Sequence, residues 1–227
     1  MRQYRHELKF MINKSMAKAL QQKLKLVMTV DQNYYNSDGT YIIRSLYFDD
    51  DESSSYYEKL DGVLHRKKYR IRIYNYDDSV IKLECKHKDD SYTLKRSTSI
   101  TREDVEDLIS GNIDHIKTDN ELLKELVLEM KLKRLKPSVI VDYRRLAFTY
   151  PVSEVRVTFD YQVSSGYNNY DIFDRNATSI STIDDKELVL EVKFNDILPS
   201  HIALLLQSVP TVRQAFSKFA VCRSMKE

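Results

Sequence analysis

The sequence predicts an α+β protein with a mostly antiparallel sheet of about eight strands and four or five inserted helices. Two observations predict this class. Segments that alternate apolar and polar residues recur along the chain, and amphipathic helical segments interrupt them. Short turns between neighbouring strands favour a closed or nearly closed barrel with the helices packed outside. Repeats and linkers are absent from the sequence, so a single domain over residues 1–227 is expected.

The first half of the chain contains most of the expected strands. They are predicted at residues 4–10, 40–48, 69–76, 80–87 and 91–99. The third and fourth of these strands are expected to form a hairpin with its turn at Asp77-Asp78-Ser79. One helix is predicted over residues 15–28, because Met16, Leu20, Leu24 and Val27 share a helical face. Asn13 or Ser15 is its expected cap.

Two further helices carry start and stop residues. Thr101 and Asp104 form a pair typical of a capping box, and Gly111 marks the end of that helix. Thr118 and Glu121 repeat the pattern before a stripe made of Leu122, Leu123, Leu126, Val127 and Met130, and Pro137 marks the stop. Strands are then predicted at 138–148, 152–161 and 187–194, with helical segments at 199–209 and from residue 211 onwards.

Composition excludes several classes of protein. Thirty-six Lys and Arg face 34 Asp and Glu, and a net charge of +2 argues against general nucleic-acid binding. Two distant cysteines exclude a disulfide scaffold and a cysteine zinc site, and they fit a reducing compartment. Neither a signal peptide nor an apolar run long enough to span a membrane is evident. We therefore expect a cytoplasmic protein without its own anchor, which could lie at a membrane through a membrane-protein partner.

The distribution of charge along the strands is more informative than its total. Residues i and i+2 share a strand face, so several expected strands carry one apolar and one charged face. The charged faces hold Arg5, Glu7 and Lys9; Arg70 and Arg72; Lys82, Glu84 and Lys86; Arg156, Thr158 and Asp160; and Glu191 and Lys193. Such faces could be solvated. We favour an inward orientation, because the amphipathic helices need the apolar faces to cover.

An inward face rich in arginine and lysine repels itself unless an anion fills the space. Arginine offers a planar fork to phosphate oxygens and lysine a mobile point charge, so a polyanionic phosphate is the expected occupant. Interspersed carboxylates would suit a divalent cation that bridges to phosphates.

Short motifs with these charges follow one another along the chain. They are YRHELKF at 4–10, SLYFDDDESSSYYEKL at 45–60, KYRIRIY at 68–74, LECKHK at 83–88, YTLKRS at 92–97, VDYRRLAF at 141–148, VRVTFD at 155–160, LVLEVKF at 188–194 and FSKF at 216–219. In this order they resemble the VTC domain, the polyphosphate polymerase domain of the vacuolar transporter chaperone family and its bacterial relatives. That family belongs to the triphosphate tunnel metalloenzymes, the CYTH-like superfamily.

The resemblance implies a phosphotransferase that passes the γ-phosphate of ATP to polyphosphate in a basic tunnel, with Mn²⁺ or Mg²⁺ as cofactor. The implied catalytic residues are Arg70, Arg72, Lys86, Arg145 and Arg156, with Arg145 a better match than its neighbour Arg144. The implied phosphate-binding residues are Arg5, Lys9, Lys59, Lys95 and Lys218, and the implied metal ligands are Glu7, Glu84 and Glu191. The chain departs from many tunnel enzymes at Arg5, where their first motif glutamate stands, and this agrees with the VTC branch.

Two alternatives stay open. The chain could hydrolyse triphosphate or polyphosphate, or it could bind polyphosphate or inositol phosphates without turnover. Other candidate sites are weaker: the five histidines lack metal-ligand spacing, Cys85 lies on an apolar strand face, and a Walker-type glycine-rich loop is absent. The acidic run from Asp49 to Glu52 is interpreted as a solvated turn.

Overall fold

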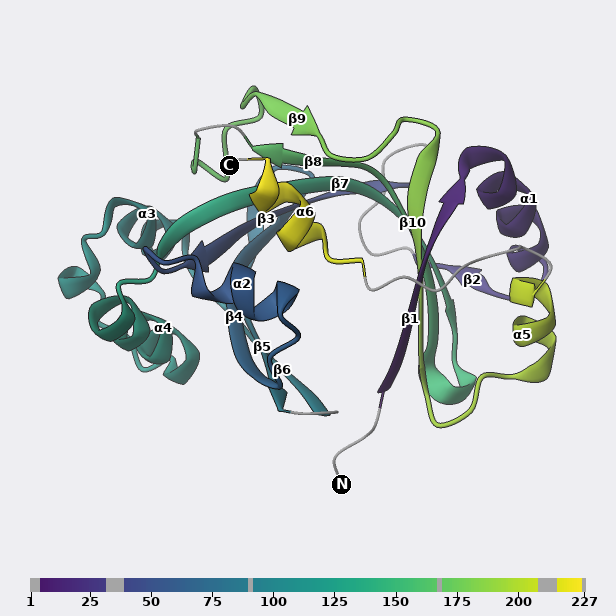
Figure 1. Cartoon of the computed structure of the whole chain (residues 1–227), viewed down its shortest axis with the longest axis horizontal. Helices are drawn as coiled ribbons and strands as arrows, with labels where there is room; N and C mark the ends of the chain where they lie inside the picture. The colour runs from purple at the N-terminus through teal and green to yellow at the C-terminus, as the bar shows by residue number, and fades with distance from the viewer. Residues whose placement is uncertain (1–4, 32–38, 90–91, 167–168, 208–215, 226–227) are drawn as a thin grey trace. The chain divides into compact units, whose positions relative to one another are not determined.

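Ten strands and six α-helices make up the described part of the chain, which comprises residues 5–31, 39–89, 92–166, 169–207 and 216–225 of a computed structural model (Figure 1). The strands are β1 (Arg5–Asn13), β2 (Thr29–Val30), β3 (Tyr41–Asp49), β4 (His65–Tyr74), β5 (Asp77–Asp89), β6 (Tyr92–Ser99), β7 (Lys136–Tyr150), β8 (Val155–Gly166), β9 (Ser179–Ser181) and β10 (Glu187–Asn195). The α-helices are α1 (Lys14–Leu24), α2 (Ser54–Leu60), α3 (Arg102–Ser110), α4 (Glu121–Lys133), α5 (Ser200–Gln207) and α6 (Lys218–Ser224), with 3₁₀ turns η1 (Ile113–His115) and η2 (Val152–Glu154). The predicted α+β class is confirmed.

Eight of the strands follow one another in a hydrogen-bonded path. Its order is β1-β10-β8-β7-β3-β4-β5-β6, and the short strands β2 and β9 pair with β7 and β8. Every pairing with a described register is antiparallel. β1 and β6 are the two ends of the path, so backbone hydrogen bonds between the described strands do not close the expected barrel. Closure would require these two end strands to pair with each other.

The chain divides into two compact units. Unit 1 comprises residues 1–42, 143–163 and 183–217, and unit 2 comprises residues 43–142, 164–182 and 218–227. Each unit has its own hydrophobic core. In unit 1, Leu20 and Leu24 of α1 and Ile202 of α5 pack against the apolar faces of β8 and β10. Asn13 caps α1, as predicted, by accepting a hydrogen bond from the Met16 amide.

The core of unit 2 lies between two helices and the apolar faces of β4 and β5. Leu123 and Leu126 of α4 and Leu108 of α3 are buried there with Ile71 and Leu83. Helices α2 and α6 contact each other, and the ring of Phe219 on α6 packs at a tilt against Tyr47 of β3, with 5.0 Å between the ring centroids. Cys85 is buried in this core, as its strand face predicts, and burial raises the pKa of its thiol.

The expected hairpin between β4 and β5 is confirmed, but the predicted position of its turn is wrong. Asn75 and Tyr76 form the turn with φ of 51° and 58°, and Tyr74 pairs with Asp77. A two-residue turn with positive φ at both central positions matches the right-handed twist of the strands. Asp77 instead accepts a hydrogen bond from the Ser79 amide within β5.

The predicted start of α3 is confirmed, whereas the predicted cap of α4 is wrong. Thr101 and Asp104 form the predicted capping box of α3, and Gly111 ends the helix with φ of 81°. The cap of α4 is Asn120 rather than Thr118, because the Asn120 side chain accepts from the amides of Leu122 and Leu123. The helix ends at Arg134 in the left-handed conformation, and Pro137 already belongs to β7.

The acidic run that follows β3 is only partly a solvated turn. Asp51 and Glu52 are exposed in a turn, but Asp49 is only 2% exposed. Its carboxylate accepts hydrogen bonds from the amides of Asp50, Ser55 and Tyr56 at 2.8–3.2 Å and so caps α2, a helix that the sequence analysis did not predict. Of the helical tail expected from residue 211, α6 is described, and residues 211–215 and 226–227 lie outside the described part.

Candidate functional site

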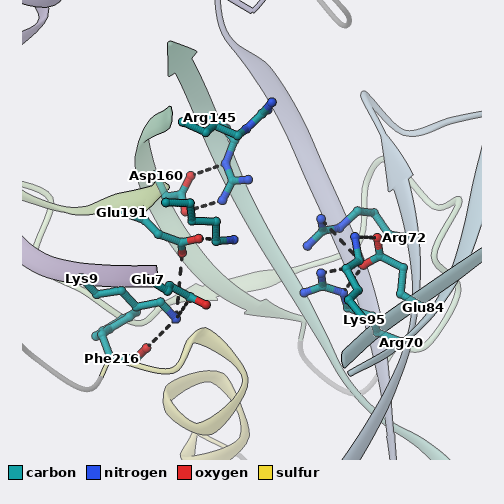
Figure 2. A network of polar contacts seen from close by, with 12 residues as sticks. Glu7, Lys9, Arg70, Arg72, Glu84, Lys95, Arg145, Asp160, Glu191 and Phe216 are labelled. Carbon is teal, nitrogen blue, oxygen red and sulfur yellow. Dashed lines mark hydrogen bonds and ion pairs between the residues drawn. The ribbon is translucent and has the colours of Figure 1, made fainter. Parts of the chain in front are cut away.

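Most of the charged strand faces are enclosed in each unit. Glu84 and Glu191 are 4% and 5% exposed, and Asp160 is fully buried. Buried charges are stable only when they are paired and hydrogen-bonded. Each face therefore carries a polar network, and Figure 2 shows the main members of both.

The first polar cluster belongs to unit 1 and consists of Glu7, Lys9, Arg145, Arg156, Thr158, Asp160, Glu191 and Lys193. Its members lie on β1, β10, β8 and β7. The register forms two cross-strand rows: Lys9, Glu191 and Thr158 in one row, and Glu7, Lys193 and Arg156 in the next. Directly opposed residues on neighbouring strands lie close enough for their side chains to interact.

Lys9 connects the two carboxylates of the first polar cluster. Its Nζ lies 2.8 Å from Glu7 Oε1 and 3.9 Å from Glu191 Oε2, and it donates to the backbone carbonyl of Phe216 at 3.3 Å (Figure 2). Glu191 also forms an ion pair with Lys193. Burial lowers the pKa of Lys193 although Glu191 and Glu7 oppose the shift. The cluster thus brings Glu7 and Glu191 to one ammonium group.

Arg145 and Asp160 form a bidentate pair. Nε and Nη2 of the guanidinium donate to the two carboxylate oxygens at 2.6 and 2.7 Å (Figure 2). Burial disfavours the charged arginine, but Asp160, Tyr143 and Glu191 outweigh it and raise the pKa of Arg145. Removing one partner of a buried pair leaves an uncompensated charge. Two of the three guanidinium nitrogens of Arg145 are therefore used inside the protein.

Thr158 and Arg156 complete the first polar cluster. Arg156 pairs with Asp31 at 2.5 Å and donates to the Tyr41 hydroxyl at 3.1 Å. Thr158 is 3% exposed, and its Oγ1 is buried without a hydrogen-bond partner among the described residues. It lies opposite Glu191 in the strand register. An unpaired buried hydroxyl is costly and needs an explanation.

The second polar cluster belongs to unit 2 and surrounds Glu84. Its cations are Arg70, Arg72, Lys86 and Lys95, from β4, β5 and β6. Nε of Arg70 donates to Glu84 Oε2 at 2.7 Å, and Nη1 of Arg72 lies 3.9 Å from the same oxygen. Lys95 pairs with the other oxygen of Glu84 (Figure 2). Hydroxyl groups on β3 support the two arginines: Arg70 donates to Tyr47 at 2.8 Å and Arg72 to Ser45 at 3.3 Å.

Charge balance differs between the two clusters. Burial would raise the pKa of Glu84, but Arg70, Arg72 and Lys95 lower it to about 2, so the carboxylate stays ionised. Three cations, Arg70, Arg72 and Lys95, then contact one carboxylate in the second cluster, and Lys86 is exposed beside them. In the first cluster, the described cations are matched by carboxylates, which are Glu7, Asp160 and Glu191 together with Asp31. The cation excess expected for the inward strand faces is therefore present among the described side chains of unit 2 and absent from those of unit 1.

Only part of the expected metal set fits a metal ion. Three cations, two of them arginines, already contact the oxygens of Glu84, so this carboxylate suits an anchor for arginine rather than a metal ligand. Glu7 and Glu191 offer hard oxygen donors that converge on Lys9. No group of three histidines, cysteines or acids that could hold a metal occurs in the described ranges. Two carboxylates still fit Mg²⁺, which commonly keeps several waters and uses substrate phosphates as further ligands.

The remaining expected site residues lie at the edges of these networks. Lys86 is exposed on β5, Lys59 lies on α2 and Lys218 is the first residue of α6. Arg144 precedes Arg145 on β7 and so points to the opposite face. Arg5 belongs to β1, but its side chain is outside the described part of the chain.

Sequence reasoning missed two residues on the same faces. Lys68 alternates with Arg70 and Arg72 on β4, so the period of the strand could have identified it. Thr158 was placed on the charged face of its strand, but its missing partner is a consequence of tertiary structure. Neither was expected to take part in the site.

Comparisons with known proteins support one family and one fold. The sequence profile of the VTC domain matches residues 4–225. A Bacillus halodurans protein proposed to be an adenylate cyclase superposes with a TM-score of 0.54 and 14% identity over 92% of each chain. The PH1819 protein of Pyrococcus horikoshii OT3 superposes with a TM-score of 0.50 and 15% identity over 98% of this chain and 99% of that chain. No curated protein matches the sequence. At these identities the two structures show a shared fold alone.

Proposed function

The chain belongs to the VTC domain family, and on this premise we propose that it is a metal-dependent phosphotransferase that extends polyphosphate with the γ-phosphate of ATP. The observation that carries the proposal is the second polar cluster, in which three cations, Arg70, Arg72 and Lys95, contact one buried carboxylate and Lys86 lies beside them. Such an excess of positive charge around a buried carboxylate is stabilised by an anion with several negative charges. The proposal takes residues 1–227 as one functional domain.

In the proposed function, the arginines and lysines of the two clusters bind phosphate in different ways. Arg70 and Arg72 present guanidinium groups that Tyr47, Ser45 and Glu84 orient, which lowers the entropy lost when phosphate oxygens bind. Lys86 and Lys95 add mobile charges beside them. In the first polar cluster, Arg156 and the third guanidinium nitrogen of Arg145 would contact phosphate. Lys9, Lys59, Lys218 and Arg5 would bind further phosphate groups.

Glu7 and Glu191 would hold Mg²⁺ or Mn²⁺. The metal neutralises charge on phosphoryl oxygens and polarises the phosphorus when it is bound. In the structure, Lys9 contacts both carboxylates and Lys193 pairs with Glu191, and these cations keep the two carboxylates close together. In the proposed transfer, a terminal oxygen of polyphosphate forms a bond to the γ-phosphorus in line. The bond to the bridging oxygen breaks, and ADP leaves. Positioning and charge stabilisation supply the rate enhancement.

A second function is favoured by one observation. Two carboxylates converge at Lys9, and no cluster of three metal-ligating side chains lies in the described ranges. This favours a module that binds polyphosphate or inositol phosphates without turnover. Hydrolysis of triphosphate or polyphosphate would use the same groups with water as the nucleophile.

None of the helices that are described is long and apolar enough to cross a membrane.

One assay separates these functions. Purified protein is incubated with ATP and Mn²⁺, and both polyphosphate chain length and free phosphate are measured. We expect chain growth, and we expect Glu191→Gln to abolish it while tripolyphosphate still binds. Glu121→Gln is the matched control, because Glu121 is an exposed acid on α4. Phosphate release without growth would identify a hydrolase, and tight binding without turnover would identify a binding module. Failure to bind any phosphate ligand would refute all three.

A further inference from the structure

We infer that Lys68 is an additional phosphate-binding residue of the second polar cluster, and that it takes up a proton when a phosphate chain binds. The inference rests on the proposed function. It adds a residue that the sequence motifs did not assign and predicts that ligand binding is coupled to pH.

The position of Lys68 follows from strand register. Lys68 shares its face of β4 with Arg70 and Arg72 and lies directly opposite Lys86 on β5. Lys86 in turn lies opposite Lys95 on β6. Three lysines therefore form one cross-strand row, next to the row that contains Arg70 and Glu84. A row of like charges on adjacent strands is destabilising unless a counter-ion is present.

Lys68 differs from the other cations of the cluster in its contacts. Arg70, Arg72 and Lys95 approach Glu84, whereas no ion pair of Lys68 occurs within the part of the chain that the structure describes. Its Nζ lies over the ring of Phe219, 4.1 Å from the centroid. Phe219 is itself buried against Tyr47. The ring face attracts an ammonium group, but it does not neutralise its charge.

The groups around Lys68 disfavour the ammonium form. Cations come from its own strand (Arg66), from α2 (Lys59) and from β5 (Lys86), and α6, whose Phe219 ring it contacts, also carries Lys218 and Arg223. The acids that face it are Asp49 and Glu58. Asp49 is engaged by three amides at the start of α2, and burial raises the pKa of both acids.

These surroundings set the direction of the coupling. Burial, followed by Arg66, lowers the pKa of Lys68 to about 7, and Asp49 opposes the shift. Near neutral pH the free protein therefore contains a large fraction of neutral Lys68. A phosphate chain beside the lysine row favours the charged form and raises this pKa again. Binding then consumes a proton, and affinity falls as pH rises through the pKa of the free protein.

Calorimetric titration with tripolyphosphate tests this coupling. The dissociation constant is measured at pH 6 and pH 8 for the wild type and for Lys68→Arg, which stays charged at both pH values. The charge of tripolyphosphate changes equally for both proteins, so it cancels in their ratio. We expect the wild type to lose about tenfold more affinity than Lys68→Arg between the two pH values, because about nine-tenths of Lys68 is neutral at pH 8. Titrations in buffers of different ionisation enthalpy should show an additional proton taken up by the wild type.

Two further variants test whether the effect is specific to the position and the charge of Lys68. Lys67→Arg is the matched control, because Lys67 lies on the opposite face of β4, where it pairs with Glu125 and Glu129. It should retain the pH dependence of the wild type. Lys68→Met should bind tripolyphosphate more weakly than the wild type at pH 6 while melting at the same temperature or higher. Identical pH dependence in the wild type and Lys68→Arg, with binding intact, would overturn this inference alone. Absence of tripolyphosphate binding at both pH values would overturn the proposed function as well.

Discussion

At the scale of single residues, Thr158 stands out because its buried hydroxyl group lacks a hydrogen-bond partner among the described residues. Its side chain is buried, and Oγ1 has no hydrogen-bond partner among the described residues. It stands opposite Glu191, beside the pair of carboxylates that converges on Lys9. A buried hydroxyl without a partner destabilises the folded state by about 1–3 kcal/mol. A hydroxyl retained at this cost is explained if a ligand of the first polar cluster supplies the missing partner.

Thr158→Val tests that explanation, because valine keeps the shape of threonine and removes the hydroxyl. We expect the free protein to be as stable as the wild type or up to about 1 kcal/mol more stable in urea unfolding. Tripolyphosphate binding in the presence of Mn²⁺ should weaken several-fold. Thr158→Ser, which keeps the hydroxyl, should restore binding. Loss of stability without any change in affinity would instead show that the hydroxyl has a structural partner.

At the scale of elements, α4 is held to the sheet of unit 2 by a polar contact as well as by its apolar stripe. Glu125 accepts a hydrogen bond from the Tyr69 hydroxyl at 2.5 Å and pairs with Lys67 at 3.2 Å and Arg96 at 2.6 Å. Burial would raise the pKa of Glu125, but Tyr69, Arg96 and Lys67 lower it to about 2. One carboxylate thus connects α4 to both β4 and β6.

Glu125→Gln should lower the free energy of unfolding by about 1–3 kcal/mol at pH 7, because the amide cannot form the ion pairs. Since the folded-state pKa lies below the unfolded value of about 4.3, the stability that Glu125 contributes is present above pH 4–5 and is lost as pH falls towards about 2. The difference between the wild type and the variant in urea unfolding should therefore shrink between pH 5 and pH 2. Glu121→Gln, which removes an exposed pair on the same helix, should change stability by less than about 1 kcal/mol at every pH.

The elements also show what local sequence can and cannot predict. Strand faces and the capping box of α3 depend on residues a few positions apart, so alternation and spacing identified them. The turn at Asn75 and Tyr76 places a tyrosine at positive φ, which its local preference disfavours. Helix α2 has seven residues and is capped by Asp49 from the preceding strand. A helix that short shows no clear hydrophobic period, so its existence depends on tertiary contacts.

At the scale of the whole chain, the sequence could predict which side chains of the candidate site share a strand face. It could not predict which of them form ion pairs and hydrogen bonds with one another. Alternation placed Arg70, Arg72 and Glu84 on one side of the sheet. The ion pair of Lys9 with Glu191 joins two strands that are distant in sequence, and the pair of Arg145 with Asp160 depends on the register of β7 against β8. The charge balance of each cluster follows from these pairings. For this reason the sequence predicted an excess of cations on the inward faces as a whole, whereas among the described residues the excess lies in unit 2.

The difference in charge balance predicts two separable contributions to ligand-dependent stability. The second polar cluster is cationic and should bind tripolyphosphate without metal, whereas the first contains paired carboxylates and should contribute only when Mg²⁺ or Mn²⁺ is added. Thermal melts should show stabilisation by tripolyphosphate in the presence of a chelator, and a further increase with metal. At a ligand concentration of 100 times the dissociation constant, each contribution is worth about 2.7 kcal/mol.

Variants in each unit assign the two contributions. Arg72→Ala should remove the metal-independent stabilisation, because Arg72 belongs to the cation-rich cluster. Glu191→Gln should remove only the increase produced by metal. Higher ionic strength should reduce the metal-independent shift, since screening weakens the attraction of phosphate to exposed cations such as Lys86. If Glu191→Gln abolished both shifts while Arg72→Ala left both unchanged, phosphate binding would depend on the carboxylates of unit 1, and the role assigned to the second polar cluster would be wrong.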